Sequence, residues 1–545
     1  MVSSSAFMLP SLRRYHPHVS LITISIQVND PAEVASAIEQ ARAAASEGAQ
    51  LVEWRVDELA VEAAGHKACH ALVRDTPMPC ILTCRMVEEG GHFGGDESDR
   101  VGLVDSLVKA GIAPKYIDVE SVAWRRDRDL RMGVGKLLAE SECGLVLSTH
   151  DFEGRPDDLA RQLDVMWAED DAAVVKVAWM ARSIRDSLEG MELLAEAAGP
   201  MIVVCMGRFG VMSRVLAGKF GGLLTFASLG EAQTTAPGQL TVDQLRNQYR
   251  FDSVSPSTSV FGIMGDPVEH SMSPLLHNTG FDLANFDGVM VPMPVIEGWE
   301  SFKASLACLL DQPALNFSGL AVTSPHKENL SRFVEEVGGT LTPMVRRCGS
   351  ANTLVVLPDG SLVADNTDTE GVVGPLRQVM TLKGSKVAML GAGGAARAAA
   401  IGLLLEGAEV VVFNRSEERA LALVDDVKAR MESPVSIEYQ SGGPQSSDGF
   451  KAVINMTTLG MDGGPDPSAS PLEALGGSAE VLTEQMIVFD AVYSPLETPF
   501  VRQASRSGAT VITGDAMFLA QAARQFKTWT GATAPMDTWM ALLGS

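Results

Sequence analysis

The chain has 545 residues, of which 46% are hydrophobic and 20% charged, enough apolar material for two or three packed domains. Its 68 acidic and 43 basic residues give a net charge of -25, which repels phosphate backbones and anionic lipids and argues against nucleic-acid and membrane partners. No apolar run reaches the roughly 20 residues that span a bilayer, so we expect a soluble protein. The seven cysteines are dispersed, which indicates reduced thiols in a reducing compartment.

Residues 1–20 are Ser-rich and contain no acidic residue. We expect a disordered tail that ends where the first strand begins at Leu21. The expected location is the cytoplasm. A plastid is the alternative if the tail, which carries Arg13 and Arg14, belongs to a transit peptide.

Short apolar, β-branched runs recur eight times in the first half and alternate with stretches of helical periodicity. The runs begin at Leu21, Leu51, Cys80, Lys115, Gly144, Ala173, Met201 and Leu223. This alternation predicts an α/β fold with a (β/α)8 TIM barrel, whose active site gathers at the carboxyl ends of the strands. Polar residues do stand there: Glu53, Arg55, Arg85 and His150.

Lys176 lies inside the sixth apolar run, VVKVAW, with no carboxylate beside it in sequence. Burial disfavours an ammonium ion, so such an amine is a candidate nucleophile for imine formation with a ketone. The alternative is a lysine whose stem is buried at a strand end while its amine reaches water.

Six segments in this half resemble the type I dehydroquinate dehydratase family over residues 21–246: EWRVD, CRMVEEGG, STHDF, VVKVA, MGRFGVMSR and APGQL. The resemblance implies Lys176 as the Schiff-base amine, His150 as the residue that removes and returns a proton, and Glu89 as its companion acid. It also implies substrate-binding residues, with Arg214 on the carboxylate: Ser25, Glu53, Arg55, Arg85, Arg214, Thr235 and Gln239.

His66 and His70 have the i, i+4 spacing of a helical metal site. No third ligand stands near them in sequence, and the chemistry implied by the resemblance needs no metal. We therefore expect no metal site.

The polar, Ser/Pro-bearing segment 247–259 is the expected interdomain linker. Further on, KVAMLGAGGAARAAAIGLLLEGAEVVVFNRS predicts a strand, a glycine turn, a helix and a second strand, the dinucleotide-binding Rossmann unit. Its cofactor-binding candidates are Gly391, Ala392, Gly393, Gly394, Ala395 and Ala396. The second strand ends in Asn414, Arg415 and Ser416, with Arg419 following, where an NAD enzyme would have an acid. Positive charge there favours the 2'-phosphate of NADP.

The segments GDPVEHSMSP, VTSPHKE, SANT, DNTD, DAVYSPLETP and GDAMFLAQAARQF, in this order, resemble shikimate dehydrogenase from about Val260 to the end. The resemblance implies a substrate domain of 260–370 completed by 515–545, around an NADP domain of 371–514. It implies Lys327 and Asp368 as the catalytic pair, with Ala491 and Gly514 near the nicotinamide. The implied substrate-binding residues are Ser271, Ser273, Thr323, Asn352, Tyr493, Gln521 and Gln525.

Together the two resemblances predict a tandem enzyme that dehydrates 3-dehydroquinate and reduces the 3-dehydroshikimate to shikimate with NADPH. A metabolite-sensing regulator is the alternative, but a pure sensor could dispense with the catalytic residues, and all are present. The resemblance also disfavours a quinate-preferring second half, because in plant relatives quinate specificity goes with loss of hydroxyls at the positions of Ser273 and Thr323, and both hydroxyls are present here. The expected partners are these small molecules, and the expected assembly is a monomer or small homo-oligomer.

Overall fold

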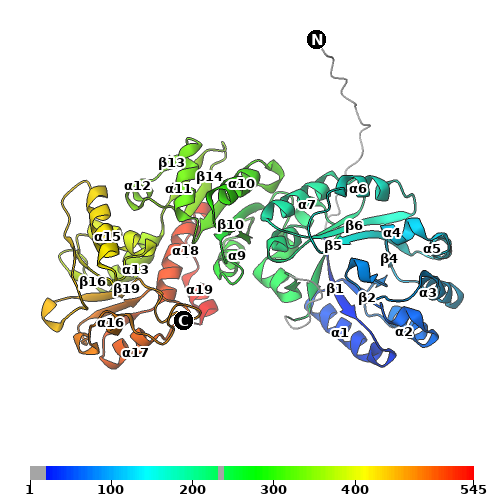
Figure 1. Ribbon diagram of the computed structural model, residues 1–545, viewed down its shortest axis with the longest axis horizontal. Helices are drawn as coiled ribbons and strands as arrows, with labels where there is room; N and C mark the ends of the chain where they lie inside the picture. Colours follow the sequence, from blue (N-terminus) through cyan, green and yellow to red (C-terminus); the bar gives the residue numbers. More distant parts are fainter. Residues whose placement is uncertain (1–19, 231–237, 545) are drawn as a thin grey trace, which may run out of the picture.

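The computed structural model describes residues 20–230 and 238–544. Within them the chain forms three sheets that follow one another in sequence, from the blue end to the red end of Figure 1. Residues 1–19 of the predicted tail, and the predicted site residue Thr235, lie outside the described residues. No helix of the described part is long and apolar enough to cross a membrane.

The first sheet curls into a barrel of parallel strands. Neighbours in sequence pair from β1 to β7, and β8 returns to pair with β1. Between β7 and β8 the Leu223 amide donates to the Met201 carbonyl at 2.9 Å. The strands are β1 (Leu21–Gln27), β2 (Leu51–Arg55), β3 (Cys80–Thr83), β4 (Tyr116–Glu120), β5 (Gly144–Asp151), β6 (Ala172–Met180), β7 (Met201–Met206) and β8 (Leu224–Ser228), with β9 (Leu240–Thr241) beside β8. The predicted barrel is confirmed.

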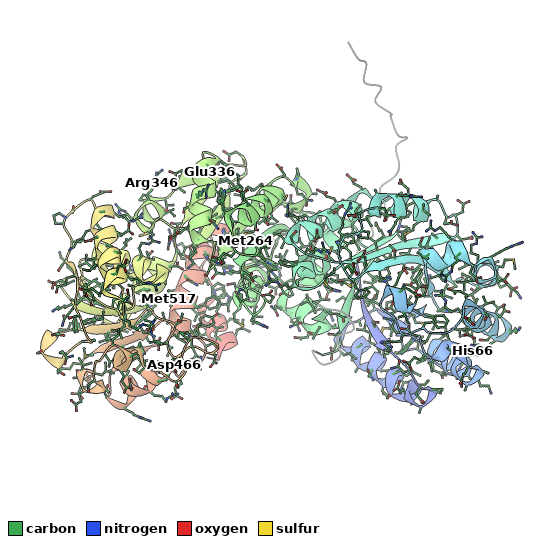
Figure 2. All side chains as sticks on the ribbon, in the orientation of Figure 1. His66, Met264, Glu336, Arg346, Asp466 and Met517 are labelled. Atoms are coloured by element: carbon green, nitrogen blue, oxygen red, sulfur yellow. The ribbon has the colours of Figure 1, made fainter. Side chains whose placement is uncertain are left out.

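Helices alternate with these strands and cover the outside of the barrel (Figure 1). They are α1 (Val34–Glu47), α2 (Ala63–Arg74), α3 (Glu97–Ala110), α4 (Ser121–Arg126), α5 (Arg128–Glu140), α6 (Leu159–Trp167), α7 (Ile184–Glu196) and α8 (Val211–Val215). On α2, Nε2 of His66 lies 2.8 Å from the Ala60 carbonyl, and Nε2 of His70 lies 2.9 Å from the Ser106 hydroxyl. Figure 2 shows His66 among these outer helices, so both rings have partners outside the barrel interior.

The segment between the halves packs against the barrel. Tyr249 and Phe251 are buried in the apolar core. Lys219 donates to the carbonyls of Pro256 and Thr258, both at 2.8 Å. The predicted linker boundaries, like the other domain boundaries, stay predictions.

The second sheet is mixed, in the order β11-β10-β12-β14-β15-β13. Its elements are β10 (Ser259–Gly265), α9 (Ser273–Leu283), β11 (Gly288–Pro294), α10 (Trp299–Leu310), β12 (Phe317–Val322), α11 (Lys327–Glu336), β13 (Thr340–Leu341), α12 (Pro343–Cys348), β14 (Thr353–Val356) and β15 (Leu362–Asp365). The last helices, α18 (Gly514–Thr530) and α19 (Met536–Leu543), share its core: Phe526 and Trp539 pack with Phe261 and Phe281. Figure 1 accordingly shows the red C-terminal helices beside green elements.

The third sheet is parallel throughout, in the order β18-β17-β16-β19-β20-β21. Counted from β16, this is the strand order 3-2-1-4-5-6 of a dinucleotide-binding fold, which confirms the prediction. The elements are α13 (Asp368–Val379), β16 (Lys386–Leu390), α14 (Gly394–Leu405), β17 (Glu409–Phe413), α15 (Glu417–Arg430), β18 (Ile437–Tyr439), β19 (Ala452–Asn455), α16 (Pro471–Ala474), β20 (Ile487–Asp490), α17 (Pro499–Arg506) and β21 (Thr510–Ile512).

Candidate active sites

A cavity of about 100 Å³ lies at the carboxyl ends of the barrel strands. All predicted barrel-site residues that the structure describes line it: Ser25, Glu53, Arg55, Arg85, Glu89, His150, Lys176, Arg214 and Gln239. They come from segments more than 200 residues apart in sequence and meet because parallel strands end at one face of a barrel.

Lys176 lies on β6 with its side chain buried among polar partners. Its Nζ donates to Asp118 at 2.9 Å and to Glu53 at 3.3 Å, and lies 4.8 Å from the ring centre of Phe226. The sequence places no carboxylate beside Lys176, but the barrel supplies two, from β4 and β2. The two carboxylates fix the position of the amine in the cavity.

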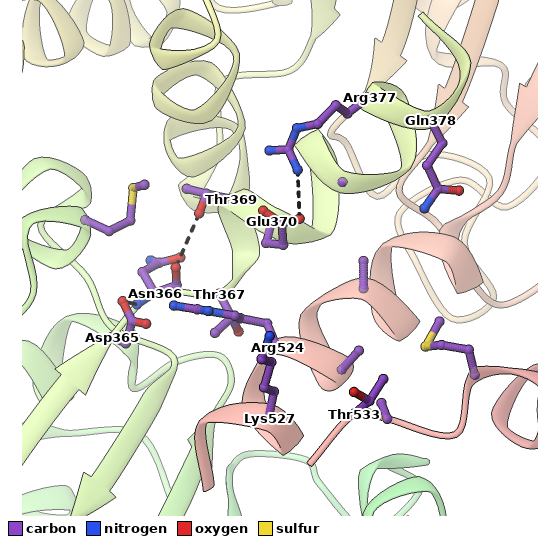
Figure 3. Close-up of a pocket in the computed structure, with 16 residues that line it drawn as sticks. Asp365, Asn366, Thr367, Thr369, Glu370, Arg377, Gln378, Arg524, Lys527 and Thr533 are labelled. Atoms are coloured by element: carbon purple, nitrogen blue, oxygen red, sulfur yellow. Dashed lines mark hydrogen bonds and ion pairs between the residues drawn. The ribbon is translucent and has the colours of Figure 1, made fainter. Parts of the chain in front are cut away.

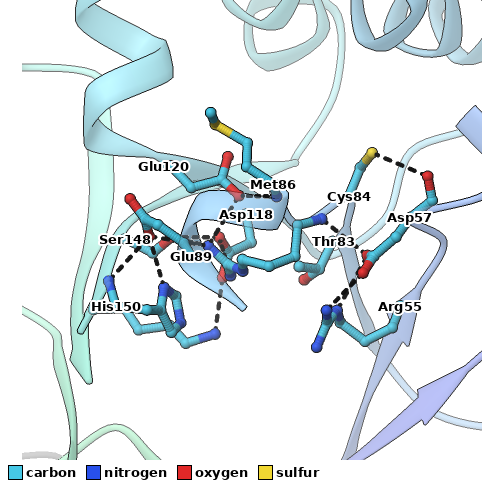
Figure 4. A network of polar contacts seen from close by, with 12 residues as sticks. Arg55, Asp57, Thr83, Cys84, Met86, Glu89, Asp118, Glu120, Ser148 and His150 are labelled. Carbon is cyan, nitrogen blue, oxygen red and sulfur yellow. Dashed lines mark hydrogen bonds and ion pairs between the residues drawn. The ribbon is translucent and has the colours of Figure 1, made fainter. Parts of the chain in front are cut away.

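The carboxylate of Asp118 joins Lys176 to a buried ion network (Figure 4). Arg85 donates to Asp118 at 2.8 Å, to Ser148 at 2.8 Å and to Glu120 at 3.2 Å. Burial alone would raise the pKa of Asp118, but Arg85 and Lys176 outweigh it and hold that pKa well below its usual range. Arg85, expected to hold a substrate hydroxyl, thus has protein partners on both terminal nitrogens.

Our sequence reasoning missed Asp118, Glu120 and Ser148. A signal was present, because Asp118 and Glu120 alternate within the otherwise apolar strand YIDVE. Acids on a strand that is buried on both faces need partners. Those partners lie on neighbouring strands far away in sequence, so the pattern alone does not identify them.

His150 and Glu89 form the second polar pair of this cavity. Oε2 of Glu89 lies 3.0 Å from Nδ1 of His150 and accepts the His150 backbone N–H at 3.0 Å (Figure 4). Burial lowers the pKa of His150 well below its ordinary 6.5, and the nearby cations of Arg85 and Lys176 act in the same direction. Burial also raises the pKa of Glu89 to about 8. The imidazole is consequently neutral at pH 7 and can accept a proton.

Arg214 is a buried cation of the cavity with no counter-ion among residues 20–230 and 238–544. Its Nε and Nη2 have no hydrogen-bond partner among the described residues, and Nη1 lies 3.4 Å from the carbonyl oxygen of Phe226. Burial lowers its pKa to about 10. An unpaired guanidinium fork facing a small cavity fits a carboxylate in two-point contact.

The other predicted barrel residues are held by local contacts. Arg55 makes a two-point ion pair with buried Asp57 at 3.2 and 2.6 Å. The Ser25 hydroxyl donates to Glu53 at 2.7 Å, and Gln239 donates to the carbonyl of Ala227 at 2.8 Å. These side chains line the rim with both donors and acceptors, as a polyhydroxylated ligand requires.

A second cavity, of about 260 Å³, lies between the second sheet and α18. It contains every predicted dehydrogenase residue outside the cofactor set: Ser271, Ser273, Thr323, Lys327, Asn352, Asp368, Tyr493, Gln521 and Gln525. Our prediction missed Pro267, Val268, His270 and Phe518, which also line it. Phe518 stacks on Tyr493 with ring centres 5.9 Å apart.

Lys327 and Asp368 form an ion pair of 2.6 Å inside this cavity. Each residue begins a helix, α11 and α13 respectively. Asp368 accepts a second bond from Asn352 at 2.8 Å. The carbonyl oxygen of the Asn352 side chain is fixed in turn by Thr353 and by the Thr367 backbone, both at 2.8 Å. The pair therefore has one set orientation, with an ammonium group facing the cavity.

A third hollow, of about 610 Å³, lies at the carboxyl ends of β16, β17 and β19. Predicted cofactor residues line it: Gly391, Ala392, Gly393, Asn414, Arg415 and Arg419. Gly391 has φ of +110°, and a Cβ there would stand 2.8 Å from Thr457. Cβ atoms on Gly393 and Gly394 would enter open space in front of α14. This glycine turn before a helix N-terminus fits a pyrophosphate.

The arginines of this hollow suit a further phosphate. Arg415 and Arg419 have no ion-pair partner within residues 20–230 and 238–544, although Asp466 also lines the hollow. Ser416 instead caps α15 by accepting the Arg419 amide at 3.4 Å. The residues present therefore fit a dinucleotide with a phosphorylated ribose.

Six predicted cofactor residues do not line this hollow: Gly394, Ala395, Ala396, Ser416, Ala491 and Gly514. Ala396 is fully buried in the helix packing. At Gly514 a Cβ would stand 2.4 Å from the backbone of Val492. This glycine is thus required by the packing of α18 against the loop after β20, whatever it does toward a cofactor.

A further hollow, of about 740 Å³, lies along α13 and α18 (Figure 3). Asp365, Arg377, Arg524 and Lys527 line it, and Arg377 pairs with Glu370 at 3.2 Å. None of the predicted site residues lines it. Volume alone does not identify the chemical site here.

Fold and sites together define an enzyme with two centres, a lysine-dependent lyase centre in a barrel and a dinucleotide-dependent dehydrogenase centre. Family models agree: type I 3-dehydroquinase matches residues 22–256, the shikimate dehydrogenase substrate binding domain matches 263–354, and shikimate/quinate 5-dehydrogenase matches 376–439. A bifunctional 3-dehydroquinate dehydratase/shikimate dehydrogenase of Arabidopsis thaliana, described as chloroplastic, is 32% identical over 515 residues, covering 91% of this chain and 80% of the relative. The chain belongs to this bifunctional family.

Other matches cover one half of the chain or nearly all of it. An NADP(+) shikimate dehydrogenase of Methanothermobacter thermautotrophicus is 36% identical over 288 residues, or 52% of this chain and 95% of the relative. A solved dehydroquinate dehydratase and shikimate dehydrogenase structure from S. pombe is 23% identical, with a TM-score of 0.43 and coverage of 97% of this chain and 99% of that chain.

Proposed function

We propose that this chain carries out two consecutive steps of the shikimate pathway: dehydration of 3-dehydroquinate to 3-dehydroshikimate at the barrel, and NADPH-dependent reduction to shikimate at the second cavity. The observation that supports this proposal is that each cavity holds its predicted reactive lysine against a carboxylate, Lys176 against Asp118 and Lys327 against Asp368. Since the product of the first site is the substrate of the second, one chain performs a connected conversion.

In the first step, the amine of Lys176 adds to the substrate ketone, and the resulting carbinolamine loses the former ketone oxygen as water to give an iminium. The iminium makes the adjacent C2 proton more acidic. Neutral His150 takes that proton and returns it to the departing C1 hydroxyl, which leaves as water. Hydrolysis of the iminium then frees Lys176 and the product. Asp118 and Glu53 position the amine, and Arg214 holds the substrate carboxylate.

In the second step, Lys327 gives its proton to the carbonyl oxygen as that oxygen becomes a hydroxyl, and Asp368 orients Lys327 at 2.6 Å. The hydride would come from NADPH held in the neighbouring hollow. Ser271 and Ser273 hold the substrate carboxylate, while Asn352 and Gln525 contact hydroxyls. Arg415 and Arg419 would hold the 2'-phosphate of the cofactor, which would favour NADP over NAD.

The test is coupled turnover of the full chain with 3-dehydroquinate and NADPH. Lys176→Ala should abolish the first activity only, and Lys327→Ala should cripple the second only. Lys176→Arg is the matched control, because it keeps a cation between Asp118 and Glu53 but forms no imine, so it should be equally inactive. Borohydride should trap 3-dehydroshikimate on Lys176 in the unaltered chain. Loss of both activities in either alanine variant, with folding intact, would contradict two separate sites.

The alternatives predict different results. A metabolite-sensing regulator would bind these ligands without turnover. A quinate-preferring second half would oxidise quinate faster than shikimate, which Ser273 and Thr323 on the cavity wall disfavour. We propose a monomer or small homo-oligomer in the cytoplasm, with a plastid as the alternative. Seven unpaired cysteines suit either reducing compartment, and fractionation of cells tests the choice.

A further inference from the structure

An ion pair crosses from the barrel to the dehydrogenase half. Arg208, two residues after the end of β7, donates through Nη1 to Asp266 at 2.6 Å and to Glu269 at 3.2 Å, and through Nη2 to Asp266 at 3.4 Å. The Arg208 side chain is 37% exposed, and those of Asp266 and Glu269 are 26% and 25% exposed. Neither acid has another side-chain cation partner among the described residues.

The two acids belong to the segment that shapes the dehydrogenase cavity. Between β10 and α9, this turn places Pro267, Val268, His270 and Ser271 on the cavity wall. Glu269 accepts the Val268 amide at 2.9 Å, and the Ser271 amide donates to the Val268 carbonyl at 3.1 Å. A rotation of the Glu269 side chain would therefore disturb the backbone that carries Ser271.

Ser273 depends on the same turn. Its amide donates to the Ser271 hydroxyl at 3.2 Å, so the two serines keep a fixed relation. The ion pair thus lies on the outer side of a turn whose inner side presents hydroxyls to the cavity. Without Arg208, two carboxylates would stand uncompensated beside a cavity proposed to take an anionic substrate, and like charges raise the free energy of binding.

We infer that Arg208 is a positioning residue for the second active site, through which the barrel sets the affinity of the dehydrogenase for its carboxylate-bearing substrate. It holds the turn that carries Ser271 and neutralises Asp266 and Glu269. The inference rests on the proposed function of the second cavity. Arg208 belongs to the barrel, the domain of the dehydration, but its proposed role is in the reduction at the second cavity.

Removing this ion pair should leave the two halves joined. Gln312 on the dehydrogenase side donates to Glu192 of α7 at 2.6 Å, and Lys219 holds two carbonyls of the connecting segment. Helix α8 also packs on β11. Arg208→Gln should therefore fold and keep its dehydratase activity.

The experiment measures both activities in the full chain carrying Arg208→Gln. The KM for 3-dehydroshikimate should rise roughly three- to tenfold, the range expected for partly exposed ion pairs with two partners. The kcat of the reduction, the KM for NADPH and the dehydratase activity should change less than about twofold. Arg208→Lys should recover part of the affinity, because one charge remains while the two-point geometry is lost.

Two controls separate positioning from a general effect. Arg155→Gln removes a two-point pair of similar exposure, 34%, that joins two segments of the barrel domain through Glu189 of α7. This variant should leave the KM for 3-dehydroshikimate unchanged. In an Asp266→Asn, Glu269→Gln background, adding Arg208→Gln should have no further effect, because the partners are gone.

An unchanged KM in Arg208→Gln would overturn the inference, and so would an undiminished effect in the background that lacks both acids. Equal loss of both activities with a lower melting temperature would also overturn it, because it would show a purely structural role. Failure of the proposed function looks different, since the unaltered chain would then not reduce 3-dehydroshikimate at all.

Discussion

Replacing Arg214 with methionine should make the chain more stable and its barrel site much less active. The Arg214 guanidinium is buried, two of its nitrogens have no partner among the described residues, and burial lowers its pKa to about 10. Methionine removes the charge but keeps a long, flexible, apolar side chain that can fill the space. The usual expectation for a core substitution is a loss of stability, so a gain would be informative.

The magnitude follows from the pKa. A fall from 12.5 to about 10 corresponds to roughly 3 kcal/mol of destabilisation, at about 1.36 kcal/mol for each pKa unit. Below pH 10 Arg214 is charged in both the folded and the unfolded chain, so this penalty applies in full at neutral pH. It disappears only as the pH rises from about 10 toward 12.5. Allowing about 1 kcal/mol for imperfect packing of methionine, we expect a net gain of about 2 kcal/mol.

The assays are denaturant unfolding, calorimetry and steady-state kinetics on the full chain. A gain of about 2 kcal/mol should raise the melting temperature of the barrel by about 4 to 8 °C. Loss of two charge-assisted hydrogen bonds to the substrate carboxylate, together about 3 kcal/mol, should lower kcat/KM for 3-dehydroquinate roughly 100-fold. Added 3-dehydroshikimate should stabilise the unaltered barrel but not the variant.

Arg55→Met is the matched control, because Arg55 pairs with buried Asp57. That substitution leaves the buried Asp57 carboxylate without its cation and should lower the free energy of unfolding by about 3 kcal/mol or more. If Arg214→Met were also less stable than the unaltered chain, the guanidinium would have partners that offset its burial, and the reasoning would be wrong. A kcat/KM within fivefold of the unaltered value would refute its contact with the carboxylate.

Three further predictions concern other parts of the chain. Because the pKa of Glu89 is about 8, its ionisation above that pH should favour the imidazolium of His150, so dehydratase kcat should rise through pH 8; Glu89→Gln should remove this inflection in a pH profile. Arg415→Ala should raise the KM for NADPH roughly tenfold and leave that for NADH unchanged, as initial rates with each cofactor will show. Trp539→Ala should destabilise the dehydrogenase half by about 3 to 5 kcal/mol in urea titrations, because the indole is fully buried against Phe526.

The barrel and the dinucleotide fold were predictable from sequence because their signals are local. Strand after strand is a short β-branched run, and the glycine turn at Gly391 stands between a strand and a helix. Lys176 and His150 could be placed at one face because parallel strands in a barrel end together. The order of strands and helices was therefore enough to predict which of these residues meet in the first site.

The partners of those residues were not predictable to the same extent. Asp118 contacts Lys176 across 58 residues, and Arg208 contacts Asp266 across another 58. Such contacts depend on side-chain direction and on how two halves meet, and neither leaves a periodic signal in sequence. At Gly514 the structure adds a packing reason for glycine, the close approach to the Val492 backbone, which the motif does not reveal, and its cofactor contact stays a prediction.

The charges of the barrel site explain how an acidic protein selects an anionic substrate and orients it. Three of the cavity's basic residues are paired with carboxylates: Lys176 with Asp118, Arg85 with Asp118 and Glu120, and Arg55 with Asp57. Within the described part of the cavity, Arg214 alone remains uncompensated. We therefore expect a substrate carboxylate to bind most favourably at Arg214, and we propose that this contact directs the ketone toward Lys176. Neutralising the other cations is thus part of the specificity, because an unpaired Arg85 or Arg55 would offer the carboxylate a second, unproductive position.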